Sequence, residues 1–147
     1  MKYFSSTQRA YIAGFLDGDG SIYVRMKPNK DYRYGFQIAP YVVLFQSAKD
    51  KKKFERICTL IGLGYLRERN DGILEYVIQK RDAIKKLLIM VRPYAILKRA
   101  QIDLMLQILK RKESIKDKTD FIALAKLIDR FREINYSKKR KVHMLTP

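Results

Sequence analysis

The chain is poor in several residue types, and each shortage excludes a class of protein. It has one cysteine, Cys58, and one histidine, His143, so it can form no intramolecular disulfide, and a zinc site built from these two residues is not expected. No apolar run approaches the ~20 residues of a transmembrane helix. The N-terminal stretch MKYFSSTQRA also lacks the apolar core of a signal peptide. We therefore expect a soluble intracellular protein, in the cytoplasm or nucleoid, or in an organelle if the source is eukaryotic.

Acidic residues are scarce relative to basic ones. The 147 residues include 32 Lys and Arg against 15 Asp and Glu, which gives a formal net charge of +17 at pH 7. Such an excess predicts a polyanionic partner, because basic side chains that neutralise phosphates release condensed counterions and so bind nucleic acid strongly and in a salt-sensitive way. An anionic membrane surface is the competing partner. Since no segment could span a membrane, we expect nucleic acid and no membrane partner.

The remaining composition favours one domain. Hydrophobic residues make up 47% of the chain, too many for a disordered basic tail, and the length suffices for one core. No internal repeat or low-complexity stretch appears. We expect a single domain over 1–147, with a folded core over 7–137 and a basic tail over 138–147. The run KKRK at 138–141 is read either as a nuclear localisation signal or as a phosphate-contacting or disordered segment.

Hydrophobic periodicity predicts a helix, two strands, a helix, two strands and then further helices. Thr7 is expected to cap the first helix, and Pro40 to mark a kink or bulge in the second strand. The expected elements are helix 8–17, strands 21–27 and 33–46, helix 50–61, strands 64–69 and 73–78, and helices 82–90, 94–110 and 119–135. In the first strand, Tyr23, Arg25 and Lys27 share the face opposite the apolar side chains. A basic and aromatic outer face is unlike an ordinary solvated one.

The most informative segment is YIAGFLDGDGSI at 11–22, where an apolar helix meets two acidic residues framed by glycines. Glycine inside a helix costs about 1 kcal/mol relative to alanine, so Gly14, beside Ala13, needs a packing reason such as a second helix. Asp19 falls where the last helical carbonyls lack partners and the helix dipole is negative. A carboxylate there favours a cation, and these oxygen donors are the kind that Mg²⁺ prefers.

Two other interpretations of this segment exist. A calcium loop of the EF-hand type fails, because Ile22 would stand where glycine is required and Pro28 where glutamate is required. An ordinary turn that ends a helix and opens a strand stays compatible with these residues taken alone. The choice between turn and metal site depends on whether the rest of the chain needs a metal.

Three segments together resemble one family. IAGFLDGDG at 12–20, IGLGYLRER at 61–69 and PYAILKRAQ at 93–101 are similar to the LAGLIDADG homing endonucleases that carry one motif per chain. The resemblance implies an α+β fold of order αββαββα, with a four-stranded antiparallel sheet lying on DNA, followed by C-terminal helices. It also implies a site-specific endonuclease that hydrolyses both DNA strands across the minor groove and leaves 3′ overhangs. The implied cofactor is Mg²⁺, with Mn²⁺ as an alternative.

The resemblance also implies roles for particular residues. Asp19 and the carbonyl of Gly18 would hold the metal, Gln46 would orient water or touch the metal from outside, and Lys98 would stabilise phosphate charge. Asp17 would support the helix end. One motif per chain supplies one such acid, so the resemblance implies a homodimer with a pseudopalindromic target, and with Ala13 and Gly14 near the helix–helix contact.

Further residues are expected to contact DNA. The family often has a basic residue after the strand-end glutamine, and the register leaves Lys49, Asp50, Lys51 and Lys52 as candidates. Basic and amide side chains on the strands suit base edges, since arginine and lysine pair with guanine and glutamine pairs with adenine. The expected DNA-contacting set is Tyr23, Arg25, Lys27, Tyr32, Arg33, Gln37, Tyr41, Arg67, Arg69 and Glu75.

Two alternatives compete with the nuclease. An intron maturase on the same fold would bind intron RNA, and would not need Asp19, Gln46 and Lys98 together. A generic basic nucleic-acid-binding domain, such as a ribosomal protein, would explain the charge and leave the DGDG junction unexplained.

Overall fold

The computed structural model describes residues 3–135, so the predicted basic tail lies outside the described residues. The elements are, in order, α1 (Ser6–Asp19), β1 (Gly20–Pro28), β2 (Phe36–Ser47), η1 (Ala48–Asp50), α2 (Lys51–Ile61), β3 (Tyr65–Glu68), β4 (Ile73–Ile78), α3 (Arg81–Val91), α4 (Arg99–Glu113), α5 (Lys118–Asp129) and α6 (Phe131–Ile134). The strands form one antiparallel sheet of order β1-β2-β4-β3. The predicted α+β class and the order αββαββα with additional C-terminal helices are confirmed.

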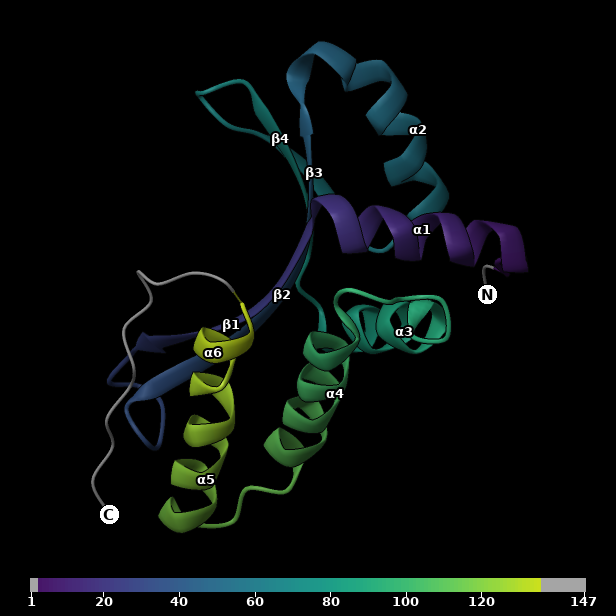
Figure 1. The fold of residues 1–147 in the computed structure, drawn as a ribbon. Helices are drawn as coiled ribbons and strands as arrows, with labels where there is room; N and C mark the ends of the chain where they lie inside the picture. Colours follow the sequence, from purple (N-terminus) through teal and green to yellow (C-terminus); the bar gives the residue numbers. More distant parts are fainter. Residues whose placement is uncertain (1–2, 136–147) are drawn as a thin grey trace.

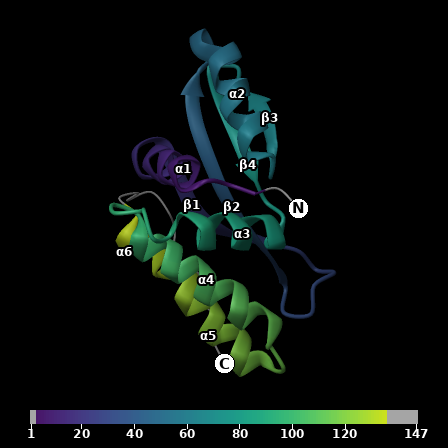
Figure 2. The same cartoon turned by 90° about the vertical axis from the view of Figure 1, so that its right-hand side faces the viewer.

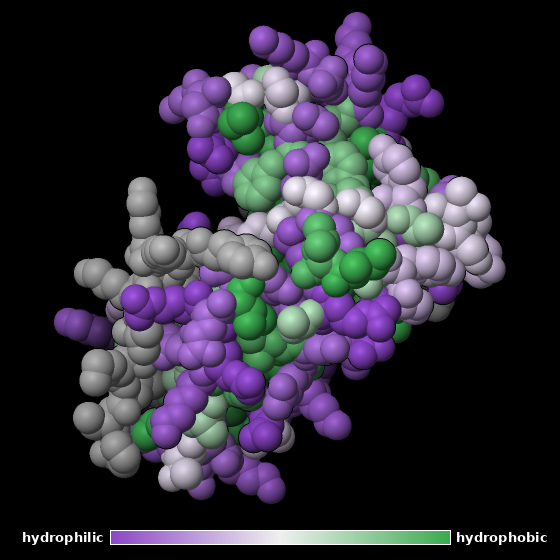
Figure 3. Space-filling model, in the orientation of Figure 1, coloured by the Kyte–Doolittle hydropathy of each residue, from purple (hydrophilic) through white to green (hydrophobic). Residues whose placement is uncertain are grey.

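The helices α1 to α4 lie on one face of the twisted sheet (Figures 1 and 2). Alternation in β1 turns Ile22, Val24 and Met26 into the core between the sheet and these helices. Much of the surface visible in Figure 3 is hydrophilic, as the charge of the chain requires. Within residues 3–135, no helix is both long and apolar enough to cross a membrane.

The first helix begins earlier than predicted. Ser5 accepts a hydrogen bond from the backbone N–H of Gln8 (3.1 Å), and the Gln8 side chain accepts one from the N–H of Ser5 (3.0 Å). This reciprocal capping box satisfies two donors at once, so the helix begins at Ser6. The prediction that Thr7 caps the helix is therefore wrong.

The pairing of the second strand with the first continues through Pro40 without a break. The β1–β2 register is unbroken from Gly20↔Leu44 to Pro28↔Phe36, and Pro40 pairs with Val24. The predicted bulge is absent from this hairpin. The reason is that β4 pairs with β2 only from Val42 onward, so Pro40 has a neighbouring strand on one side only and its missing N–H can face away from the ladder.

The last predicted helix is divided into α5 and α6 at Arg130. Two side chains draw the following segment toward other elements: Gln101 of α4 donates to the carbonyl of Ile134 (2.9 Å), and Asn135 donates to the carbonyl of Ile22 in β1 (2.9 Å). These bonds link positions far apart in the sequence. The helical pattern of 119–135 could not show them.

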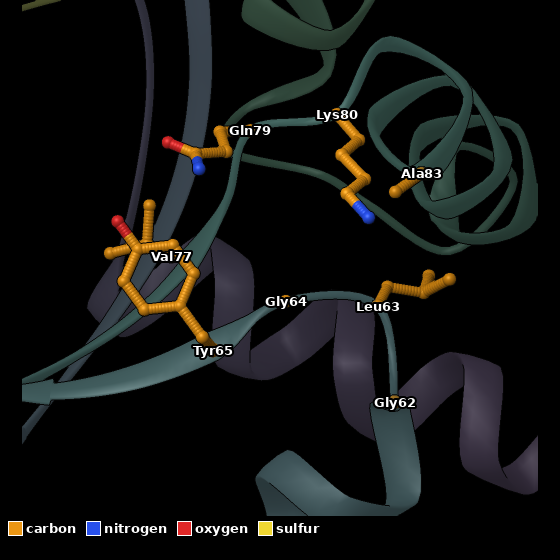
Figure 4. A pocket seen from close by; sticks show the side chains of 8 residues that line it. All are labelled: Gly62, Leu63, Gly64, Tyr65, Val77, Gln79, Lys80 and Ala83. Atoms are coloured by element: carbon orange, nitrogen blue, oxygen red, sulfur yellow. The ribbon is translucent and has the colours of Figure 1, made fainter.

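The linker between α2 and β3 is fixed by close backbone contact with β4. The buried Tyr76 hydroxyl accepts hydrogen bonds from the N–H groups of Leu63 (2.8 Å) and Gly64 (2.7 Å). A Cβ at Gly64 would lie 2.1 Å from the carbonyl oxygen of Val77, so only glycine permits this approach. Figure 4 shows the linker beside β4, with the ring of Tyr65 next to Val77.

We predict that Tyr76→Phe lowers the free energy of unfolding by about 1–2 kcal/mol, because two backbone donors lose their acceptor. Chemical denaturation measures the effect. Tyr34→Phe is the matched control, since the buried Tyr34 hydroxyl has no hydrogen-bond partner among the described residues and its removal should be neutral or stabilising. Equal losses in the two variants would contradict the role assigned to the Tyr76 hydroxyl.

Candidate functional site

The end of α1 presents one unpaired carboxylate. The helix ends at Asp19 and β1 begins at the next residue, Gly20, whose N–H bonds to the carbonyl of Leu16. A Cβ at Gly20 would lie 2.7 Å from that carbonyl oxygen, so glycine allows the direct change from helix to strand. Gly18 and Asp19 are exposed, and the Asp19 carboxylate has no hydrogen bond or ion pair with any described residue. It is therefore free to meet a ligand.

Asp17 has the opposite environment. Its Oδ2 accepts from the N–H groups of Ile96 (2.7 Å) and Leu97 (3.1 Å), and its Oδ1 accepts from the N–H of Lys98 (3.1 Å). Burial raises the pKa of the Asp17 carboxyl, but the three N–H donors and the charge of Lys98 outweigh it, so the pKa lies below the ordinary value. With both oxygens occupied, Asp17 supports the helix end, as expected from the sequence.

The same contacts place Lys98 at the end of α1. Its ammonium group donates to the carbonyl oxygen of Asp17 (2.7 Å), one of the carbonyls that α1 leaves free at its C-terminus. The prediction of a helix over 94–110 is wrong at its start, since α4 begins at Arg99. The reason is that the N–H groups of residues 96–98 bind Asp17 in a loop.

Gln46 lies near this helix end by register. Gly20 pairs with Leu44, so Gln46 is two residues further along β2, past the junction where α1 ends and β1 begins. Its Oε1 accepts from the N–H of Ser47 (2.9 Å). Gln46 and Lys98 were chosen only through the family resemblance, and both lie around the end of α1 that carries Asp19.

A pocket of about 520 Å³ adjoins the helix end and is lined by Asp17, Lys98, Gln101 and Asn135, among others. Gln101 and Asn135 were not predicted to lie here. No local pattern marks them, because each arrives through a tertiary hydrogen bond. Among residues 3–135, no three acidic, His or Cys side chains gather into a group that could hold a metal. The described part of one chain thus offers few side-chain ligands for a metal ion.

Of the basic candidates after Gln46, Lys51 forms an ion pair with Glu68 (3.1 Å). Lys49 and Lys52 are exposed and have no side-chain partner among the described residues, and Asp50 lies at the N-cap of α2. Because the Lys51–Glu68 pair is exposed and therefore weak, Lys49, Lys51 and Lys52 all stay available as cations.

The outer face of β1 and β2 carries an ordered aromatic and cationic cluster. Tyr23 and Tyr41 are directly opposite and stack with ring centroids 5.2 Å apart. The guanidinium of Arg25 lies 5.6 Å from both ring centroids, and Lys27 donates to the Tyr41 hydroxyl (3.0 Å). Cation–π contacts of this kind hold long side chains in place. This part of the face presents its positive charge in a fixed arrangement.

The other predicted DNA-contacting residues lie on the same face or in its loops. Gln37 is opposite Lys27, while Tyr32 and Arg33 are exposed in the β1–β2 loop. Arg67 pairs with Glu75 across β3 and β4 (3.9 Å), and Arg69 pairs with Asp71 (2.5 Å). Exposed ion pairs are worth at most about 1 kcal/mol, so these arginines can exchange partners at low cost.

The centre of the outer face is apolar. Only 6% of Val77 is exposed, because Val43 and Tyr65 are its direct neighbours across the sheet. Val43 is buried as well. The polar and charged side chains therefore lie around an apolar centre, which suits thymine methyl groups better than hydrogen bonding.

The two residues predicted at the dimer contact, Ala13 and Gly14, differ in their exposure to solvent. Ala13 is completely buried in the core of its own chain, so it has no surface to offer a second chain. Gly14 is exposed, and a Cβ there would meet nothing within 4 Å. Gly14 thus has no packing reason among residues 3–135.

Asp17→Asn should lower the free energy of unfolding at neutral pH by about 1–2 kcal/mol, since charged hydrogen bonds become neutral ones. The folded-state pKa of Asp17 is lowered, so its contribution is complete above the ordinary aspartate pKa of about 3.9 and is lost as the pH falls through the folded-state pKa. The free energy of unfolding of the variant should therefore fall less steeply than that of the wild type as the pH is lowered, as measured by denaturation across pH. Asp103→Asn, which removes an exposed pair with Arg92, is the control. If Asp17→Asn lowers the free energy of unfolding no more than Asp103→Asn does, the supporting role assigned to Asp17 is wrong.

Comparisons with known proteins identify the family. Residues 12–108 match the family model described as LAGLIDADG endonuclease. The chain is 31% identical to DNA endonuclease I-CreI of Chlamydomonas reinhardtii over 132 residues, covering 89% of this chain and 80% of that protein. It is 33% identical to DNA endonuclease I-CvuI of Chlorella vulgaris over 133 residues, covering 90% and 83%. A crystal structure of the homing endonuclease I-CvuI with its target, in the presence of 2 mM Ca, matches with a TM-score of 0.85 and 32% identity over 92% of this chain and 87% of that chain. The chain belongs to the LAGLIDADG endonuclease family.

Proposed function

We propose that this protein is a site-specific endonuclease that hydrolyses both strands of a long pseudopalindromic DNA target and leaves 3′ overhangs. One observation carries the proposal: the exposed, unpaired Asp19 carboxylate shares the end of α1 with the ammonium group of Lys98, in a chain whose outer sheet face is basic. The relatives at 31% and 33% identity are DNA endonucleases, which supports the same chemistry here.

The donors at the helix end suit a hard divalent cation. The Asp19 carboxylate and the Gly18 carbonyl are oxygen ligands, and structures of I-CvuI with DNA were determined in the presence of Mg or Ca. Bound there, Mg²⁺ (or Mn²⁺) would activate water as a nucleophile and stabilise charge on the leaving oxygen. Lys98 would offset the negative charge of the phosphate, and the Gln46 amide would orient the attacking water. One carboxylate is too few for a metal site, so a second chain and DNA phosphates would complete it.

The exposed face of α1 supports a homodimer. Small residues recur on it every four positions and all are exposed: Ser6, Ala10, Gly14 and Gly18. Small side chains at this spacing let a second helix approach closely. Ile96 and Leu97, in the loop held by Asp17, are 82% and 73% exposed, and Figure 3 shows apolar surface beside the end of α1. A second copy packed here would cover this surface and bring two Asp19 carboxylates together.

Asp19→Asn should reduce DNA cleavage by at least about 100-fold, because one metal-binding charge is lost, while DNA binding is retained. Cleavage selection from a randomised DNA library with the wild-type protein supplies the target. Cleavage in Mg²⁺ and binding by gel shift are then compared. Glu55→Gln, an exposed carboxylate on α2, should cut normally. An Asp19→Asn variant that still cuts would disprove the metal role, and a wild-type protein that binds RNA without cutting DNA would favour the maturase.

Gly14→Leu should convert the protein into a folded monomer that no longer makes double-strand breaks. A Cβ at this exposed position meets no described residue within 4 Å, and leucine favours a helix over glycine by up to about 1 kcal/mol, so thermal stability of the monomer should not fall. Sedimentation velocity reports the oligomeric state. Gln107→Leu, on an exposed position of α4, should remain dimeric. A Gly14→Leu variant that stays dimeric and active would exclude α1 from the interface.

A further inference from the structure

The open edge of β2 lines a pocket that none of the expected catalytic residues enters. β4 pairs with β2 only over Val42–Ser47, so residues 36–41 have a neighbour, β1, on one side only. The β1–β2 hairpin accordingly extends beyond the end of β4 (Figures 1 and 2). A pocket of about 440 Å³ occupies this edge, and its polar lining includes Lys27, Gln37, Tyr41, Lys80, Arg81 and Lys112.

The pocket carries unbalanced positive charge. Four of its lining residues are cationic and none is acidic. Arg81 already has acidic partners, since it pairs with Asp82 (2.8 Å) and with Glu113. The ammonium group of Lys80 points toward Leu63 and Ala83, on the side of the neighbouring pocket (Figure 4). The charge that has no acidic partner inside the pocket thus comes from Lys27 and Lys112.

Among residues 3–135, the hydrogen-bond acceptors of these two lysines are neutral. Lys27 donates to the Tyr41 hydroxyl (3.0 Å), and Lys112 donates to the carbonyl of Ile38 (3.2 Å) at the unpaired edge of β2. Partial burial, with the nearby Arg81 charge, lowers the pKa of the Lys112 ammonium group. An anion placed between the two lysines would oppose that shift.

The position of the pocket fits the backbone of a bound duplex. Lys27, Gln37 and Tyr41 belong to the outer face that holds the Tyr23–Tyr41 cluster, so the pocket continues that face past the sheet edge. When a sheet lies in a major groove about 12 Å wide, the sugar-phosphate strands pass along the flanks of the protein elements in the groove. The edge of β2 is such a flank.

We propose that the pocket at the open edge of β2 binds a phosphate of the DNA backbone, with Lys112 and Lys27 as its cationic ligands. The proposal rests on the proposed function for the presence of duplex DNA on the outer face, and it needs no cleavage. A phosphate contact fixes the position of the duplex and carries no base information. The site would therefore add affinity and register for every sequence alike.

The test is the salt dependence of binding to a random-sequence duplex, measured by fluorescence anisotropy without divalent metal. For Lys112→Gln, the slope of log K against log salt should shrink by about 0.9 for each chain, the value for one phosphate contact. Lys110→Gln removes the same charge from an exposed position on the same helix, outside the pocket, and should change the slope by less than half as much. Lys112→Arg should keep the slope of the wild type.

Because Lys112 also donates a hydrogen bond to the Ile38 carbonyl, its substitution could disturb the fold as well as phosphate binding. A second variant separates these two effects. Lys27→Gln leaves that carbonyl bond intact and should reduce the slope as well. The double variant should lose less than the sum of the two single losses, because both lysines hold one phosphate. Equal slopes for Lys112→Gln and Lys110→Gln, or additive losses in the double variant, would overturn the phosphate site while leaving the endonuclease proposal intact. A wild-type protein that binds no duplex would overturn both.

Discussion

The carboxylate of Asp17 is the interaction on which the arrangement of the site depends. It accepts three backbone N–H groups from residues 96–98, and the Lys98 side chain returns a bond to the Asp17 carbonyl. This joins the last turn of α1 to the start of α4. The contact holds a cation at the helix end and keeps Ile96 and Leu97 on the surface. Without it, the helical pattern from residue 94 would favour an earlier start of α4, and Lys98 would leave the end of α1.

Two carboxylates two residues apart have different roles because their surroundings differ. Both lie at the negative end of a helix dipole, where an anion is unfavourable. For Asp17, three N–H donors and Lys98 compensate that cost inside the chain. For Asp19, no described residue compensates it. The Asp19 carboxylate is exposed, so it is left to solvent or to a ligand. Under the proposed function that ligand is a divalent cation, held jointly with the same helix end of a second chain.

The sequence predicted what local patterns encode and missed what distant hydrogen bonds decide. Period-two alternation and the glycines placed the strands and the end of α2 within about three residues of their observed bounds. The start of α4 and the break at Arg130 were missed, because they depend on Asp17 and on Gln101 and Asn135, whose partners lie far away in the chain. Gln46 and Lys98 came from the resemblance alone. The burial of Ala13 needed the packed core to be known.

The high charge of the chain and the order of its outer face have separate consequences for recognition. A net charge of +17 gives affinity for any duplex, since phosphate neutralisation is independent of sequence. Discrimination between sequences must come from the few side chains whose positions are fixed before binding. The stacked rings of Tyr23 and Tyr41 hold Arg25, so less side-chain freedom is lost when this guanidinium meets a base edge. The apolar centre at Val43 and Val77 forms no hydrogen bonds to bases. Base-specific hydrogen bonds are therefore expected from the β1–β2 hairpin and the β3–β4 hairpin, on either side of that centre.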